Sequence, residues 1–384
     1  MSTAVGQVDR PSTASPPPSS GAGSSGKADL KKFMFGLLGL IITVYLMGLA
    51  FQAITIYDGM PKLAQAGIGI LAGVGGAMLL FYFLNMVVEG LPQRIEGVLK
   101  PYVFVLPAVL FITVFLIYPT IQTIVYSFAN SDTTAWVGFE NYSQILGDSN
   151  FQETIINNLL WILIVPAVTV AMGLAVAVLA DKLSPTWEKI AKSIIFLPMA
   201  ISFVGAATIW RFVYDKSTST DQVGLLNGIL VGMGIEPVSW LQESNWNFND
   251  ILLMLILVWL QVGFSMVLLS AAIKSVPEET LEAARIDGAN ETQTFFRVVV
   301  PQIKGTLITV FITVLILVMK VFDVVYVMTN GQFGTNVIGL EFFKQIFQFD
   351  NAGLASTIVV ILMIAVIPVL IYQVKHFREE EAAR

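Results

Sequence analysis

The sequence contains no cysteine, which excludes disulfide bonds, thiolate metal sites and a cysteine nucleophile. Its one histidine, His376, lies in the polar C-terminal segment, where we expect an ordinary solvated side chain. Charged residues make up only 12% of the chain, roughly half of what soluble domains carry. These absences leave little material for metal or acid–base catalysis, so we predict no cofactor and no metal.

Long apolar runs are what the chain has instead. Hydrophobic residues make up 55% of it and the mean hydropathy is +0.76, values typical of a polytopic membrane protein. A helix needs roughly 20 apolar residues to cross the hydrocarbon core of a bilayer. Eight such runs are present: Phe33–Ile56, Ala66–Val88, Tyr102–Val125, Leu159–Ala180, Ala191–Val213, Ile251–Ile273, Thr306–Met328 and Ala352–Val374. The predicted fold class is all-α, with eight transmembrane helices.

Lysine and arginine concentrate on the cytoplasmic side of membrane proteins. The segment 129–158 contains neither residue, whereas three other loops are basic through Arg94 and Lys100, Lys182 and Lys189, and Lys274, Arg285, Arg297 and Lys304. The bias places both termini and the loop after the sixth run in the cytoplasm. Residues 57–65, 129–158, 214–250 and 329–351 are then expected outside.

The loop between the sixth and seventh runs, residues 274–304, is polar and rich in helix formers. Ser275-x-x-Glu278 matches a capping box, and Pro277 suits a first helical turn. Gly288 is a natural helix stop. Asn290-x-x-Gln293 is expected to start a second helix, and Pro301 to open the next membrane segment. The predicted structure is a helix, a glycine bend and a second helix lying against the membrane.

The spacing within this loop is more informative than its composition. Glu282-Ala283-Ala284 is followed by Gly288, then by aliphatic Val298 and Val300 and by Pro301. This pattern resembles the cytoplasmic coupling loop of binding-protein-dependent ABC importer permeases, with every gap as that family has it. The bland alternative is a surface helix that happens to be rich in alanine and glutamate, but such a helix would not need the full spacing.

Two further elements resemble those of sugar permeases. Val137-Gly138-Phe139-Glu140-Asn141-Tyr142 precedes the pair Asn157-Asn158, and Phe322-Asp323 is followed by Thr329-Asn330-Gly331. Sugar permeases usually continue with Gly-Pro, whereas this chain continues with Gln332-Phe333-Gly334-Thr335. That departure is similar to the α-glucoside branch of the maltose-type family, whose members import sucrose-, trehalose-, maltose- or glucosylglycerol-like compounds.

The resemblance implies a type I ABC importer permease core in a bacterial cytoplasmic (inner) membrane, with both termini cytoplasmic. The implied division is a disordered cytoplasmic tail at 1–32, an accessory transmembrane helix pair at 33–100, the permease core at 101–374 and a cytoplasmic tail at 375–384. Implied partners are a second, different permease, two ATP-binding subunits, an extracytoplasmic sugar-binding protein and membrane lipid, without nucleic acid.

The chain itself is expected to be a non-catalytic subunit. Gly21-Ala22-Gly23-Ser24-Ser25-Gly26-Lys27 matches most of a phosphate-binding loop, but Ala28 stands where serine or threonine is needed for magnesium and no strand precedes it. ATP hydrolysis is therefore expected on separate subunits. The resemblance assigns contact with them to six residues of the coupling loop: Glu282, Ala283, Ala284, Arg285, Asp287 and Gly288.

Five residues within the spans are candidates for the sugar pathway: Trp259, Gln261, Phe264, Lys320 and Asp323. Sugars bind through aromatic stacking and through amide and hydroxyl hydrogen bonds, and Trp259 and Phe264 match aromatic positions of the maltose-type site. Lys320 and Asp323, three residues apart, are expected on one helical face. They form either a polar floor for the solute or a mutually satisfied pair near the outer interface.

Part of the maltose-type pattern is missing, because Val318 and Val321 stand where that site has asparagines. The alternative function is a secondary transporter or channel for small polar solutes. Such proteins usually distribute ionisable residues over several spans, whereas here only Lys320 and Asp323 lie well inside one.

Cysteine labelling tests the predicted topology. Ser131→Cys is expected to react with an impermeant thiol reagent added to intact cells, because segment 129–158 is predicted outside. Ser184→Cys is expected to stay unlabelled until the membrane is permeabilised. The cysteine-free background makes each label specific to the new residue, and the reverse pattern would overturn the topology.

Overall fold

The structure is a computed structural model that describes residues 28–56, 60–217, 224–242 and 247–382. These residues are almost entirely helical and form no strand, apart from one isolated bridge between Ala129 and Trp136. The predicted all-α fold class is therefore confirmed. Residues 1–27 of the predicted disordered tail lie outside the described residues, and the first helix begins at Leu30.

The chain divides into two compact units, Met1–Tyr118 and Pro119–Arg384. The described part of the first unit contains α1 (Leu30–Ile56), α2 (Lys62–Ile70), a π-helical turn η1 (Leu71–Gly75), α3 (Gly76–Glu89) and α4 (Gln93–Ile112). Helix α1 packs along α3, and α4 also contacts α3. Glycine permits this close packing, because a Cβ on Gly39 would lie 2.2 Å from the Phe83 ring.

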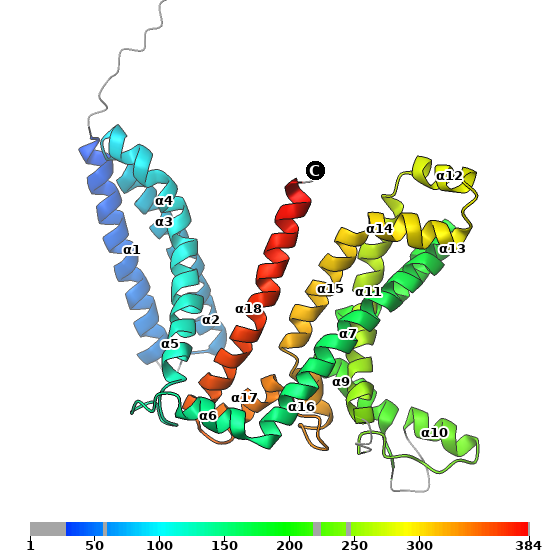
Figure 1. Cartoon of the computed structure of the whole chain (residues 1–384). Helices are drawn as coiled ribbons and strands as arrows, with labels where there is room; N and C mark the ends of the chain where they lie inside the picture. Colours follow the sequence, from blue (N-terminus) through cyan, green and yellow to red (C-terminus); the bar gives the residue numbers. More distant parts are fainter. Residues whose placement is uncertain (1–27, 57–59, 218–223, 243–246, 383–384) are drawn as a thin grey trace, which may run out of the picture. The chain divides into compact units, whose positions relative to one another are not determined.

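The second unit begins at the start of α5, which α4 reaches through the π-helical turn η2 (Thr113–Ile117) (Figure 1). Its helices are α5 (Tyr118–Tyr126), α6 (Glu140–Gly147), α7 (Ser149–Asp181), α8 (Pro185–Phe196), the 3₁₀ turn η3 (Leu197–Ala200), α9 (Phe203–Tyr214), α10 (Leu225–Gly232), α11 (Phe248–Lys274), α12 (Glu278–Ile286), α13 (Glu291–Thr294), the π-helical turn η5 (Phe295–Val299), α14 (Val300–Gln302), α15 (Lys304–Met319), α16 (Asp323–Met328), α17 (Ile338–Phe347) and α18 (Ala352–Ala382).

Among the described residues, six helices are long and apolar enough to cross a membrane, or eight if two bent pairs each count as one span. The first bent pair covers the fifth predicted run, and the second joins Glu291–Gln302 of the coupling loop to α15, in which the seventh run begins. The prediction of one helix over Ala191–Val213 is wrong, because α8 with η3 meets α9 at an angle of 103°. Ser202 starts α9 by accepting a hydrogen bond from the Gly205 amide at 3.1 Å.

The seventh run, predicted as a helix over Thr306–Met328, is also interrupted. Helix α15 ends at Met319 and α16 begins at Asp323, with Lys320 (φ −112°, ψ 28°) and Phe322 (φ −148°, ψ −58°) outside helical geometry. Hydropathy shows only that a stretch is apolar. Apolar residues fit a broken span as well as a straight one, so hydropathy cannot predict the break.

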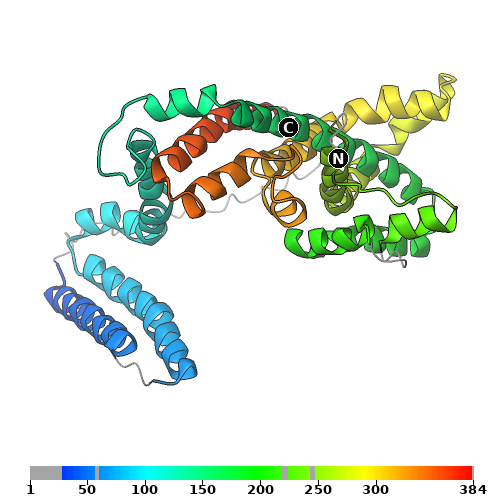
Figure 2. The ribbon, with the colours of Figure 1, turned by 90° about the horizontal axis from the view of Figure 1, so that it is seen from below.

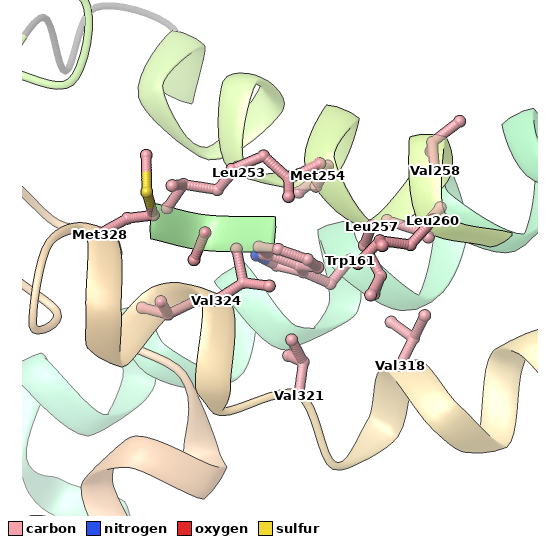
Figure 3. Packing of buried hydrophobic residues seen from close by; sticks show 14 of the residues in the cluster. Trp161, Leu253, Met254, Leu257, Val258, Leu260, Val318, Val321, Val324 and Met328 are labelled. Atoms are coloured by element: carbon pink, nitrogen blue, oxygen red, sulfur yellow. The ribbon is translucent and has the colours of Figure 1, made fainter. Parts of the chain in front are cut away.

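The core of the second unit lies between α7, α11 and the α15–α16 segment (Figure 3). Trp161 of α7 is fully buried and lies among Leu257 and Leu260 of α11 and Val324 of α16. Glycines bring the helix backbones together at two places. A Cβ on Gly173 would lie 2.3 Å from the Ser265 hydroxyl, and a Cβ on Gly263 only 2.5 Å from the Ile195 carbonyl oxygen.

The two ends of the second unit carry different elements. Helices α12 and α13 and the C-terminal end of α18 lie at one end, and α6, α10 and α17 lie at the other (Figure 1). Seen from the latter end, α17 and the start of α18 lie side by side (Figure 2). The predicted cytoplasmic loop and C-terminus thus share an end of this unit, opposite the described parts of the predicted outer segments 129–158, 214–250 and 329–351. Which end faces the cytoplasm stays a prediction.

The close approach at Gly263 predicts a stability effect. Gly263→Ala would drive a methyl group into the α8 backbone, and overpacking of this kind costs about 1–3 kcal/mol. Thermal unfolding of the detergent-solubilised protein is expected at a lower temperature than for the unaltered chain. Gly147→Ala is the control, because its added Cβ meets no heavy atom within 4 Å; equal losses in both variants would contradict the packing argument.

Candidate functional site

The glycine bend of the coupling loop forms as predicted. Gly288 has φ +82°, the left-handed conformation that glycine adopts most easily. The Ala289 amide donates to the Ala284 carbonyl oxygen at 3.0 Å, and the Gly288 amide donates to that of Arg285 at 3.1 Å. This pair of bonds is a Schellman motif, which satisfies carbonyls at the end of α12 that would otherwise lack partners.

The start of α12 differs from the prediction. Pro277 precedes the helix with φ −60° and ψ 132°, and no side chain caps its first turn. The predicted capping box at Ser275 is wrong, because α11 continues to Lys274 and Ser275 caps that helix. Its hydroxyl donates to the Ala272 carbonyl oxygen at 2.7 Å, so it is not available to α12.

The second helix of the loop begins with the predicted capping box. Asn290 accepts from the Gln293 amide at 2.8 Å, and the Gln293 side chain accepts from the Asn290 amide at 3.0 Å. Pro301 was predicted to open the next membrane segment. This prediction is wrong, because Pro301 lies within α14. The segment Glu291–Gln302 meets α15 at 69°, so the next span begins at Lys304.

The six predicted coupling residues all lie on α12 or at its end. Glu282, Ala283, Arg285, Asp287 and Gly288 are exposed, and Ala284 is half-buried. The sequence reasoning missed Ile286, whose side chain is 85% exposed beside these polar residues. A large apolar side chain exposed on an otherwise polar helix is the signal that could have identified it.

The Gly-Phe-x-Asn-Tyr element shapes the turn after α5. Asn141 donates to the carbonyl oxygens of Ser127 at 3.1 Å and Ala129 at 2.7 Å. The Tyr142 hydroxyl lies 2.8 Å from that of Ser127, and Gly138 has φ +63°. Asn141 thus satisfies two backbone carbonyl groups of buried residues, and the element as a whole stabilises the conformation of this outer segment.

The paired asparagines of α7 hold the segment that follows α16. Asn157 donates to the carbonyl oxygens of Gly334 at 2.5 Å and Asn336 at 3.0 Å, and Asn158 accepts from the Ile338 amide at 2.7 Å. The Thr329 and Thr335 hydroxyls lie 2.6 Å apart within the same segment. Two sequence elements more than 170 positions apart therefore form one structure.

Trp259 lies where a pathway residue could act. It lines an apolar cavity of 330 Å³ together with Ile195, Pro198 and Trp210. The two indole rings meet edge to face, with centroids 5.8 Å apart. Trp210 was missed by the sequence reasoning. A tryptophan in the neighbouring apolar run was a signal, but the 103° bend that brings it against α11 was not foreseeable.

The five pathway candidates do not gather in one cavity among the described residues. Gln261 is buried, and Phe264 packs near a second apolar cluster that contains Met266 and Leu269. Val318 and Val321 are buried in the main core, which accounts for their apolar character.

The predicted common face of Lys320 and Asp323 is wrong, because the helix is broken between them. Lys320 is exposed at the end of α15, and Asp323 opens α16. Within the ranges that the structure describes, no ion pair joins the two residues. The Lys320 side chain is therefore not the partner that neutralises Asp323.

A second, more polar cavity lies at the α10 and α17 end of the second unit, with a volume of 840 Å³. Its described lining combines charged, hydroxyl, amide and aromatic groups, which include Arg211, Asp215, Trp240, Gln242, Thr329 and Phe333. The Thr-x-Gly element and segment 214–250, both predicted at the outer side, contribute to this lining. Most of the described lining residues come from segment 214–250, while Arg211 belongs to α9, Met328 to α16, and Phe333 to the segment after α16.

Comparison with known proteins decides what this architecture is. The family described as the binding-protein-dependent transport system inner membrane component matches residues 169–377, a range that includes α12. This chain belongs to that family. The permease is therefore a multi-pass membrane protein, and membership decides against the alternative of a secondary transporter or channel.

Two relatives are similar over most of their length. The α-glucoside transport system permease protein AglF of Rhizobium meliloti is 42% identical over 336 residues, which cover 84% of this permease and 99% of the relative. The osmoprotective compounds uptake permease protein GgtC of Synechocystis is 46% identical over 282 residues, which cover 73% and 100%.

The fold also matches solved structures of ABC importers. A bacterial ABC transporter involved in the import of the acidic polysaccharide alginate aligns with a TM-score of 0.65 and 22% identity, over 74% of this permease and 99% of that chain. The same type of transporter in complex with an alginate pentasaccharide-bound periplasmic protein aligns with a TM-score of 0.64 and 20% identity. The predicted importer-permease fold is thereby confirmed.

The bonds made by Asn157 predict a local effect at the outer segment. In Asn157→Ala the carbonyl groups of Gly334 and Asn336 lose their donor, which costs about 1–3 kcal/mol. Limited proteolysis of the detergent-solubilised permease is expected to cut near residues 330–337 faster than in the unaltered protein. Asn150→Ala is the control, because that exposed side chain makes no hydrogen bond among the described residues; similar cutting of both variants would contradict the assignment.

Proposed function

We propose that this permease is one membrane subunit of an ATP-driven, binding-protein-dependent importer, and that its cargo is an α-glucoside or a related osmoprotective compound. The observation that carries the proposal is the exposed α12 with its glycine cap, in a chain of this family. The cargo class rests on AglF and GgtC, whose names refer to α-glucosides and osmoprotective compounds.

The proposed complex contains a second permease, two separate ATP-binding subunits and an extracytoplasmic sugar-binding protein. The alginate transporter bound to its periplasmic protein supports a partner of the last kind. In this proposal both termini and α12 face the cytoplasm. The polar cavity at the α10 and α17 end and segments 129–158 and 214–250 face the binding protein. Residues 33–100 act as an accessory helix pair, and residues 101–374 form the permease core.

Uptake measurements test the proposal. A strain that lacks this permease is expected to lose uptake of at least one radiolabelled sugar among sucrose, trehalose, maltose and glucosylglycerol. A plasmid copy is expected to restore it, and depletion of cellular ATP should abolish it. Normal uptake of all four sugars in the deletion strain would contradict the proposed cargo class.

The coupling role of α12 depends on its glycine cap. Gly288→Val would force a β-branched residue to positive φ, which costs ~1 kcal/mol or more and shifts the exposed face that meets the ATPase. We expect normal insertion and assembly but less sugar transported per ATP hydrolysed, measured in proteoliposomes. Gly147→Ala, whose added Cβ meets no heavy atom within 4 Å, is the control; normal coupling in Gly288→Val would show that the bend is dispensable.

For the pathway we propose that Trp259 and Gln261 of α11 contact the sugar, with Phe264, Lys320 and Asp323 as further candidates. Trp259 supports this through its cavity, and Gln261 through a buried amide within a span. Trp259→Ala and Gln261→Ala are expected to lower uptake at unchanged membrane levels, because stacking and amide hydrogen bonds are lost. Unchanged uptake of every transported sugar would place the site elsewhere, most simply on the partner permease.

A further inference from the structure

Three helix ends meet beside the coupling loop in a cluster of charged side chains. The Glu188 carboxylate in the first turn of α8 accepts a hydrogen bond from the Lys274 ammonium at 2.5 Å and another from Lys192. Lys274 also lies 3.2 Å from Asp181 at the end of α7. Lys192 donates to the hydroxyl of Ser270, a buried residue of α11. Helix α8 is therefore joined to α11 at two points, by Glu188 to Lys274 and by Lys192 to Ser270, and Lys274 extends the link to α7.

The cluster is placed between the coupling helix and the tryptophan cavity. Lys274 is the last residue of α11, and only three residues separate it from α12. Two of these are tied to α11, because the Ser275 and Val276 amides donate to carbonyl oxygens of that helix. A movement of α12 is therefore transmitted through this short connection to Lys274.

On its other side, Glu188 belongs to the helix that forms a wall of the cavity. Ile194, Ile195 and Pro198, at the far end of α8 and in η3, line the space beside Trp259. A second close contact with α11 exists at that end, since Gly263 leaves no room for a Cβ against the Ile195 carbonyl. Helix α8 is thus fixed to α11 at both ends, by charge near the coupling loop and by backbone packing near the cavity.

We infer that Glu188 is a positioning residue that makes α8 and the end of α11 move as one body, so that displacement of α12 reaches the cavity wall. This inference rests on the proposed import function. An exposed ion pair would carry little weight. However, the Glu188 side chain is only 15% exposed, although that of Lys274 is 49% exposed, and this one carboxylate serves two ammonium groups. Removal of Glu188 leaves Lys192 and Lys274 without their shared acceptor.

The first test compares Glu188→Gln and Lys274→Met in proteoliposomes that contain the complete transporter, with radiolabelled sucrose, trehalose and maltose as probes. Each variant is expected to assemble and hydrolyse ATP, but to transport about fivefold less sugar per ATP, in the range seen for residues that transmit coupling. The double variant should be no worse than Lys274→Met alone, because both changes break the link between Glu188 and Lys274. Independent losses that add, or an unchanged ratio, would overturn the inference.

Lys189→Gln is the matched control. It removes an exposed cation from the residue next to Glu188, and no ion pair of Lys189 is present among the described residues. The amount of sugar that this variant transports per ATP hydrolysed is expected to match that of the unaltered permease. A loss as large as that of Glu188→Gln would mean that net charge at this end matters and not the Glu188 link.

The second test replaces the ion pair by a covalent one. Glu188→Cys combined with Lys274→Cys should transport less sugar per ATP hydrolysed. A short bismaleimide that joins the two thiols should restore this amount. The permease has no other cysteine to react. A tether that forms but blocks transport would show that α8 and α11 must separate during the cycle. If the unaltered transporter moves none of the three probes, the proposed function fails, whereas normal transport with an unaffected Glu188→Gln refutes only this inference.

Discussion

Hydrocarbon offers no partner to a backbone amide or carbonyl, so every non-helical stretch at membrane depth must find its hydrogen bonds within the protein. The architecture of the second unit follows from this constraint. Ser202 caps α9 at the 103° bend. The Asn157 and Asn158 side chains form hydrogen bonds with backbone groups of the segment after α16. Polar side chains in these apolar regions therefore bind backbone groups of the protein itself. For this reason a polar residue in a span is weak evidence for a ligand site.

Close packing determines which parts can move together. Gly173 and Gly263 allow α7, α8 and α11 to approach until backbone and small side chains touch. Trp161 fills the remaining space in the core. Such contacts resist gradual deformation, so motion must occur between bodies and at the breaks. The breaks at Ile201–Ser202 and after Met319 border the elements that carry Trp210 and Asp323.

The coupling loop combines a rigid cap with an exposed face. The Schellman bonds at Gly288 and the capping box at Asn290 fix the bend between α12 and α13, while Ile286 and most of the predicted coupling residues remain exposed. Local hydrogen bonds thus hold the shape of the loop without occupying the surface that a partner would need. The Glu188 cluster then links the end of α11 to α8, so that a displacement of the loop is passed on to α8.

The sequence by itself determined the helical class, the apolar runs that are long enough to cross a membrane, the family resemblance and the Gly288 bend. These depend on apolar run length and on bonds between residues at most six positions apart, as from Ala289 to Ala284. Tertiary structure alone decided the 103° bend, the break between Lys320 and Asp323, and the meeting of Trp210 with Trp259. It also decided the partners of Asn157, which lie 177 and 179 positions away. Hydropathy cannot register such features, because a break or a distant partner is set by which helices pack together and not by the character of the local residues.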